Sequence, residues 1–212
     1  MHKILLRTIP LASLLCLVAC DVDDETVTRS GDGILGAGLS ADESELDELD
    51  VDELADAIDP AFACSDAGWN TSWTNLENQV LTLVNQRRAA GASCGGVWRP
   101  PVPNLTSDSR LRCAARNHSR DMANKNYFSH TSLDGRTFRT RIEAAGYKPW
   151  LNIGENIAAG QTTASAVVNG WMASTGHCNN IMSANFKHIG IGYAYNVNAT
   201  YDHYWTQDFG RQ

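Results

Sequence analysis

The sequence predicts an α+β fold, because segments with helical periodicity come first along the chain and β-rich segments come last. Four segments between residues 74 and 173 carry apolar side chains at helical spacing. Two later segments, 188–195 and 204–209, are β-rich and flank the turn-like stretch 196–200. That arrangement is typical of an antiparallel hairpin.

The helices are expected at residues 74–90, 107–126, 136–145 and 163–173. The first begins with the capping-box spacing Thr74-x-x-Glu77 and ends before Gly91. His118 lies inside the second helix, where we interpret it as a partly exposed residue.

The first twenty residues have the pattern of a bacterial lipoprotein signal. A basic start is followed by an apolar run over residues 9–18 and by the lipobox Leu17-Val18-Ala19-Cys20. The run is shorter than the roughly 20 residues that a transmembrane helix needs. We therefore expect a signal peptide over residues 1–20, lipidation of Cys20 and attachment to a membrane of the bacterial cell envelope. A plain cleaved signal with secretion is the alternative.

Charge divides the rest of the chain into a spacer and a domain. Residues 21–59 carry fifteen acidic residues and one basic residue, for a net charge of −14, whereas residues 60–212 carry fourteen basic and nine acidic residues, for +5. So acidic a stretch, with few apolar residues, buries too little surface to fold. We expect an acidic disordered tether over residues 21–63 and one domain over residues 64–212, with a docking element in the tether as the alternative.

Basic side chains recur along the second predicted helix, at Arg110, Arg112, Arg116, Arg120 and Lys125. An exported protein meets little nucleic acid, so we interpret these residues as a solvated basic face and expect no nucleic-acid partner. Anionic cell-wall or lipid headgroups are the other options for that face.

Four cysteines lie outside the signal region: Cys64, Cys94, Cys113 and Cys178. An even number in an exported chain predicts two disulfides. Cys113 lies roughly 20 Å from His130 at 1.5 Å per helical residue, so a site shared by His130 and His177 disfavours Cys113–Cys178. Of the remaining pairings we favour Cys94–Cys178 with Cys64–Cys113. A thiol nucleophile at Cys178 is the alternative, although it would leave another cysteine without a partner.

Two histidines and one carboxylate form the candidate site. His130 ends a helical pattern, Glu155 lies between two expected loops, and His177 follows an expected turn at residues 175–176. Neutral imidazoles are common ligands of divalent cations such as zinc, and two of them leave coordination positions open. We therefore expect His130 and His177 to hold a metal, with Glu155 orienting one imidazole or acting as a base toward bound water. A structural hydrogen-bond hub around Glu155 is the alternative.

Five short motifs occur in a fixed order along the chain: FSHTS (128–132), GENIA (154–158), GWMASTGHCNNIM (170–182), IGIGYA (189–194) and YWTQDFG (204–210). Together they resemble the CAP superfamily of cysteine-rich secretory, antigen 5 and pathogenesis-related 1 proteins, in particular its bacterial single-domain branch. The resemblance implies a three-layer α-β-α sandwich with a central antiparallel sheet and a central cavity. In eukaryotic members two His and two Glu line this cavity. His130, Glu155 and His177 match three of those positions, and Ser174 stands where the second Glu would be.

The absence of the second carboxylate favours a binding function over a hydrolytic one. We expect a monomeric, envelope-anchored binding module for a lipid, glycan or peptide, with a cation in its His/Glu cavity. The alternatives are a metal-assisted hydrolase of peptide or cell-wall material that uses Glu155 as its base, and a structural or adhesion domain. Standard hydrolase motifs are absent from the sequence, although Ser129 and Ser174 neighbour the candidate site.

Overall fold

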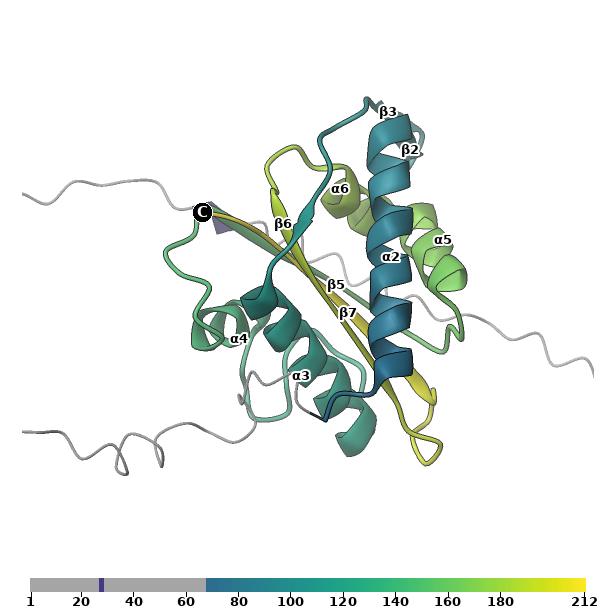
Figure 1. The fold of residues 1–212 in the computed structure, drawn as a ribbon, viewed down its shortest axis with the longest axis vertical. Coiled ribbons are helices and arrows are strands. Elements are labelled where there is room, and N and C mark those ends of the chain that lie inside the picture. Colours follow the sequence, from purple (N-terminus) through teal and green to yellow (C-terminus); the bar gives the residue numbers. More distant parts are fainter. Residues whose placement is uncertain (1–26, 29–67) are drawn as a thin grey trace, which may run out of the picture.

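The computed structural model describes residues 27–28 and 68–212, which form an α-β-α sandwich (Figure 1). In chain order the elements are β1 (Val27–Thr28), α2 (Thr71–Ala90), β2 (Ala92–Cys94), β3 (Val97–Arg99), β4 (Thr106–Ser107), α3 (Ser109–Lys125), α4 (Phe138–Ala144), β5 (Asn152–Ala159), α5 (Ala164–Ala173), α6 (Thr175–Met182), β6 (His188–Tyr195) and β7 (His203–Arg211). Helices α3 and α4 lie on one side of the central sheet, and α2, α5 and α6 lie on the other (Figure 1). The predicted α+β class and three-layer architecture are confirmed.

The central sheet has five strands in the order β1-β5-β7-β6-β4. Strands β5, β7 and β6 are antiparallel neighbours, and the short β4 is added to β6 in parallel. The predicted C-terminal hairpin is therefore confirmed as β6 and β7. Strands β2 and β3 form a separate two-stranded sheet.

The side chains of β5 alternate between the two faces of the sheet. Ile153 and Ile157 pack in the clusters that contain residues of α3 and α4, whereas Ala158 packs with α2, α5 and α6. Because the side-chain period of a strand is two residues, Glu155 points toward α3 and α4.

Helix α3 lies unusually close to the sheet, because β6 has glycines where the two cross. A Cβ atom at Gly190 would lie 2.0 Å from the carbonyl carbon of Leu111, and one at Gly192 would lie 2.3 Å from that of Ala115. Any larger side chain would push the helix outward. The close approach lets Ser119 of α3 donate a hydrogen bond to the hydroxyl of Thr206 on β7, at 2.9 Å.

The first helix begins earlier than the sequence predicts. Asn70 caps α2 by accepting hydrogen bonds from the backbone N–H groups of Ser72 and Trp73. The capping box at Thr74-x-x-Glu77 is therefore wrong, because those residues already lie inside the helix. Glu77 is buried and faces α3 instead.

Two further differences concern the candidate site. Residues 154–157 lie inside β5 rather than between loops; every residue of this strand is buried, which removes the alternation that would mark a half-exposed strand. The turn expected at residues 175–176 is the first turn of α6, so His177 lies on a helix. A helix of 8 residues is too short to show a clear apolar period.

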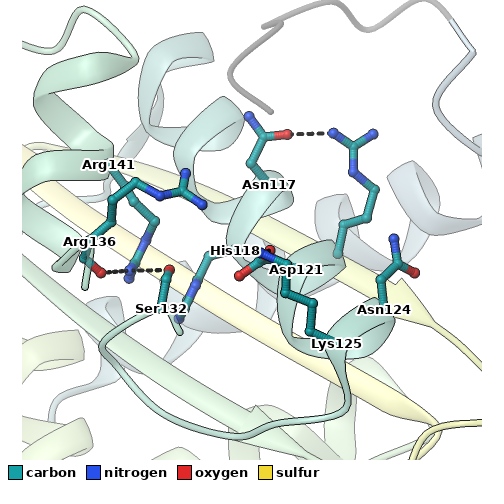
Figure 2. A pocket seen from close by; sticks show the side chains of 9 residues that line it. Asn117, His118, Asp121, Asn124, Lys125, Ser132, Arg136 and Arg141 are labelled. Atoms are coloured by element: carbon teal, nitrogen blue, oxygen red, sulfur yellow. Dashed lines mark hydrogen bonds and ion pairs between the residues drawn. The ribbon is translucent and has the colours of Figure 1, made fainter. Parts of the chain in front are cut away.

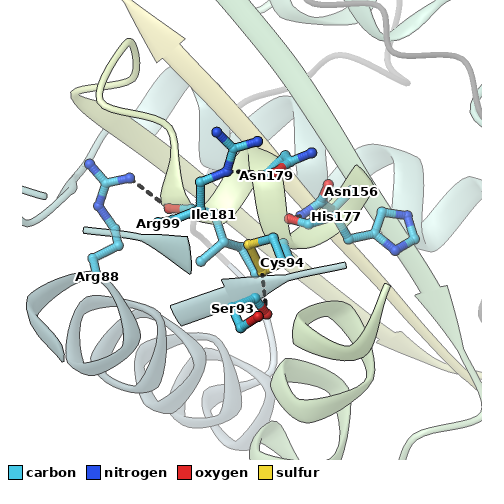
Figure 3. The surroundings of a disulfide bond; sticks show 9 residues. Arg88, Ser93, Cys94, Arg99, Asn156, His177, Asn179 and Ile181 are labelled. Carbon is cyan, nitrogen blue, oxygen red and sulfur yellow. Dashed lines mark hydrogen bonds between the residues drawn. A yellow bond between two sulfur atoms is a disulfide. The ribbon is translucent and has the colours of Figure 1, made fainter. Parts of the chain in front are cut away.

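The disulfide Cys94–Cys178, the pairing favoured from the sequence, joins the β2–β3 hairpin to α6 (Figure 3). Cys113 is also disulfide-bonded, and its expected partner Cys64 lies outside the described residues. Cys20 and the lipobox lie outside them as well. Within the expected tether, Val27–Thr28 pair with Asn152 and Ile153 of β5. Across the described part of the chain, no helix is long and apolar enough to cross a membrane.

Candidate functional site

The candidate site is centred on Glu155, whose side chain is almost fully buried in the middle of β5. One carboxylate oxygen, Oε1, lies 2.7 Å from Nδ1 of His130, in the loop between α3 and α4. The other oxygen, Oε2, accepts a hydrogen bond from Nη2 of Arg141 on α4, also at 2.7 Å. Both oxygens are therefore held by protein groups.

Arg141 ties the loop between α3 and α4 to the sheet. Its side chain is only 1% exposed. Nη2 also donates to the carbonyl of His130 at 2.9 Å, and Nη1 donates to the carbonyl of Arg136 at 2.9 Å and to the hydroxyl of Ser132 at 3.2 Å. A single guanidinium thus holds the backbone of His130 in place and also pairs with the carboxylate of Glu155.

The electrostatics keep Glu155 ionised. Burial would raise the pKa of its carboxyl group, but the charge of Arg141 and the neighbouring imidazoles of His118 and His130 hold the pKa well below its usual range. A carboxylate in this state is a strong hydrogen-bond acceptor and a weak base.

A second carboxyl group, on Asp208, lies beside Glu155. The two residues are direct partners in the antiparallel register of β5 and β7, and Asp208 is fully buried. Neither oxygen of Asp208 accepts a hydrogen bond from a donor among the described residues. Burial and the charge of Glu155 raise the pKa of Asp208 well above its ordinary value, which favours the protonated form of its carboxyl group.

His177 reaches the site from the opposite layer. It lies on α6, beside Cys178, and its ring points away from the disulfide (Figure 3). The side chain of Asn156 on β5 donates to its carbonyl at 3.2 Å, which ties α6 to the strand. Burial, together with the charge of nearby His130, lowers the pKa of His177 to about 4. The ring is therefore neutral at neutral pH.

His118 is buried rather than partly exposed, so that interpretation is wrong. Its Nε2 lies 3.0 Å from the carbonyl of Ser129, just before His130, and burial lowers its pKa to about 3. Arg116, assigned to the solvated basic face, is also buried and makes a 2.6 Å ion pair with Glu77. The glycines of β6 draw this part of α3 into the interior.

The structure thus brings together three of the predicted site residues. His130 contacts Glu155 directly, and His177 lies near enough to His130 for a proton on His130 to lower the pKa of His177. Ser174 lies at the junction of α5 and α6, at the N-cap of the helix that carries His177. Across residues 68–212, no group of three or more His, Cys, Asp or Glu side chains is arranged to hold a metal ion.

Sequence reasoning missed Arg141 and Asp208. Arg141 has no acidic residue three or four positions away on its own helix, which is consistent with a partner elsewhere in the fold but is equally common for an exposed arginine. Asp208 interrupts the β-rich run 204–209, where an ionisable residue is unusual. These two signals would have drawn attention to Arg141 and Asp208, but they would not have identified Glu155 as the partner of both.

The fold and this polar centre define a disulfide-linked α-β-α domain with two histidines around a buried carboxylate. The chain belongs to the cysteine-rich secretory protein family (CAP), whose family model matches residues 81–209.

Two relatives come from the bacterium Bacillus subtilis. The chain is 41% identical over 139 residues to the "uncharacterized protein YkwD" of Bacillus subtilis (strain 168), a match to 66% of this chain and 48% of that protein. It is 32% identical over 130 residues to the "uncharacterized membrane protein YlbC" of the same organism, covering 61% of this chain and 35% of that one. The chain therefore spans half or less of the length of these relatives.

Solved structures share the fold. An extracellular protein containing a SCP domain from Bacillus anthracis str. Ames superposes with a TM-score of 0.57 at 29% identity, covering 70% of this chain and 44% of that one. An outer surface protein of Borrelia burgdorferi gives a TM-score of 0.50 at 19% identity, covering 63% and 93%. The second likeness concerns the fold alone.

Proposed function

We propose that this chain is an extracellular or cell-envelope binding module that takes a divalent cation such as zinc through His130 and His177. Two relatives support the location: the Bacillus anthracis structure is described as extracellular, and YlbC as a membrane protein. The lipobox adds a lipid anchor at Cys20. The protein should leave the membrane fraction when Cys20→Ser is introduced, and unchanged partitioning would refute the anchor.

The contact between His130 and Glu155 carries the proposal. A carboxylate only accepts, so Nδ1–H of His130 donates to Oε1 of Glu155 over 2.7 Å. This tautomer has its lone pair on Nε2, the nitrogen that coordinates a metal when Nδ1 is held by a carboxylate. Arg141 holds the other oxygen of Glu155, so the carboxylate is positioned to orient the imidazole.

His177 fits a second ligand position. Its Nδ1 is buried and has no hydrogen-bond partner in the part of the chain that the structure describes. Its lowered pKa keeps the imidazole neutral, which coordination requires. Two imidazoles do not complete a coordination shell, so a bound zinc would accept oxygen ligands from water, a lipid headgroup, a glycan or a peptide.

A metal-assisted hydrolase is the second candidate, with Glu155 as the base. The contacts of Glu155 favour the orienting role, because both oxygens are engaged and the pKa of the carboxyl group is held low. A base needs an oxygen within reach of the proton that it removes. A structural or adhesion domain, in which the same contacts only support the fold, is the third.

Zinc content distinguishes the candidates. The full chain is equilibrated with zinc, freed of excess metal and measured by elemental analysis. We expect one zinc per chain in the wild type, loss of the ion in His130→Ala and His177→Ala, and retention in His203→Ala. His203 is a suitable control because it lies at the start of β7 and its ring is hydrogen-bonded to Tyr193.

Glu155→Gln separates orientation from base catalysis. If Glu155 orients His130, the substitution should lower zinc affinity about 10–100-fold. If Glu155 is a catalytic base, the substitution should leave zinc binding intact and abolish any cleavage of cell-wall peptide. A wild-type protein that binds no zinc, or histidine variants that bind as much as the control, would contradict the cation proposal and favour the structural domain.

A further inference from the structure

A cavity of about 240 Å³ lies between α3, α4 and the loop that joins them (Figure 2). It is distinct from the His130–His177 pair, neither of which lines it. An enclosed water needs only about 10–15 Å³, so the cavity has room for a larger solute. The cavity shares Arg141 with the surroundings of Glu155, but it contains neither proposed zinc ligand.

The charges around the cavity are mostly positive. Its lining contains four basic side chains, Arg120, Lys125, Arg136 and Arg141, and one carboxylate, Asp121. Asp121 is already engaged, because it pairs with Lys125 at 2.8 Å and accepts a hydrogen bond from Tyr127. Two carboxylates outside the lining also pair with its arginines: Asp134 pairs with Arg136, and Glu155 pairs with Arg141. The four basic side chains still outnumber these three carboxylates.

The polar atoms around the cavity are mainly donors. Arg141 lines it with a side chain 1% exposed, and its buried Nε–H has no acceptor among residues 68–212. A buried donor without an acceptor is destabilising, and the oxygens of an anion would supply the missing acceptor.

The cationic groups are held in place before any ligand arrives. Arg136 donates to Asp134 through Nε at 2.7 Å, and its guanidinium extends toward Asn117 and His118 in Figure 2. Arg120 donates to Asn117 at 2.8 Å and lies over the ring of Trp69, 5.7 Å from its centroid. Guanidinium groups fixed in this way match the geometry of phosphate oxygens.

We propose that this cavity binds a phosphate group, either as free phosphate or as the phosphate of a lipid headgroup. Arg136 and Lys125 are the principal contacts at its rim, where their side chains are 21% and 47% exposed. Arg141 forms the inner wall. A metal cation is disfavoured by the four basic side chains.

The test compares two arginines three positions apart. Arg136 lines the cavity, whereas Arg139 is half-exposed on α4, pairs with Glu143 and lies outside the lining. Thermal unfolding of the full chain is followed in inorganic phosphate and in chloride at matched ionic strength. At phosphate tenfold above Kd we expect the midpoint to rise by roughly 3–6 °C in the wild type and in Arg139→Gln. The rise should be absent in Arg136→Gln and reduced in Lys125→Gln.

An equal rise in Arg136→Gln, or no rise in the wild type, overturns the proposal. Phosphatidylglycerol vesicles then identify the source of the phosphate. If they bind the wild type and Arg139→Gln but not Arg136→Gln, and free phosphate competes, the source is a lipid headgroup. If phosphate raises the midpoint and the vesicles do not bind, the source is a soluble phosphate. Zinc content is expected to be the same in all these variants, so the two proposals fail independently.

Discussion

Replacing Arg141 with methionine should destabilise the domain more than any surface charge change. Arg141 and Glu155 are each 1% exposed, so the substitution leaves a buried carboxylate without its cation. Breaking a buried pair in this way typically costs about 3–5 kcal/mol, against a total stability of about 5–15 kcal/mol for a domain. The substitution also removes the donors to two loop carbonyls and to Ser132.

Arg139→Met is the matched control for that experiment. Arg139 is 50% exposed and makes one ion pair with Glu143 at 3.1 Å, which is worth about 0.3–0.5 kcal/mol. Both variants are measured by urea denaturation at neutral pH, and Arg141→Met is also combined with Glu155→Gln. The combined variant should lose less stability than the sum of its parts, because each single change leaves a charge unpaired. A loss for Arg141→Met as small as that of the control would refute the assigned role of the pair.

Three further changes test other parts of the fold. The pKa of Asp208 is raised in the folded state, so its contribution to stability is complete below about pH 3.8 and is lost as the pH rises through the folded-state pKa. Between about pH 4 and 8, the Asp208→Asn variant should therefore lose less stability than the wild type. Identical pH slopes of the two proteins in urea denaturation would argue against a protonated Asp208. Replacing Cys94 and Cys178 with serine opens a loop of 84 residues and should cost about 2–5 kcal/mol, whereas an unchanged melting temperature would contradict a stabilising bridge. Gly190→Ala places a methyl group 2.0 Å from the backbone of α3 and should abolish cooperative unfolding, while Gly176→Ala, which meets nothing within 4 Å, should not; equal behaviour would disprove the close packing.

The hairpin and the second helix were predictable because each is encoded by neighbouring residues. The helix predicted over residues 107–126 is α3. Its N-cap is Asp108, one residue after the predicted start, and the side chain of Asp108 accepts hydrogen bonds from two backbone N–H groups. The hairpin needs only two β-rich runs and a turn, and β6 and β7 match it within two residues. Such local signals do not depend on which elements later pack together.

The partners of Glu155 were not predictable in the same way. Asp208 meets Glu155 only because β5 and β7 pair in one particular register, which no single segment encodes. His118 lies between Arg116 and Arg120 in the sequence, which predicts an exposed position. It is buried because the glycines of the distant β6 let this part of α3 approach the sheet closely. Motif matching identified His130, Glu155 and His177, whereas the groups that control their charge come from long-range packing.

Glu77 has a consequence for how copies of this protein meet one another. This buried residue of α2 pairs with Arg116, and it also accepts the backbone N–H of Tyr193 at 3.2 Å. That N–H lies on the outer edge of β6, beyond the two residues covered by β4. An open strand edge is a template for pairing with another molecule. A carboxylate supplied by a helix therefore takes the place of a further strand at this N–H, and its loss would leave this part of the β6 edge open to pairing with another molecule.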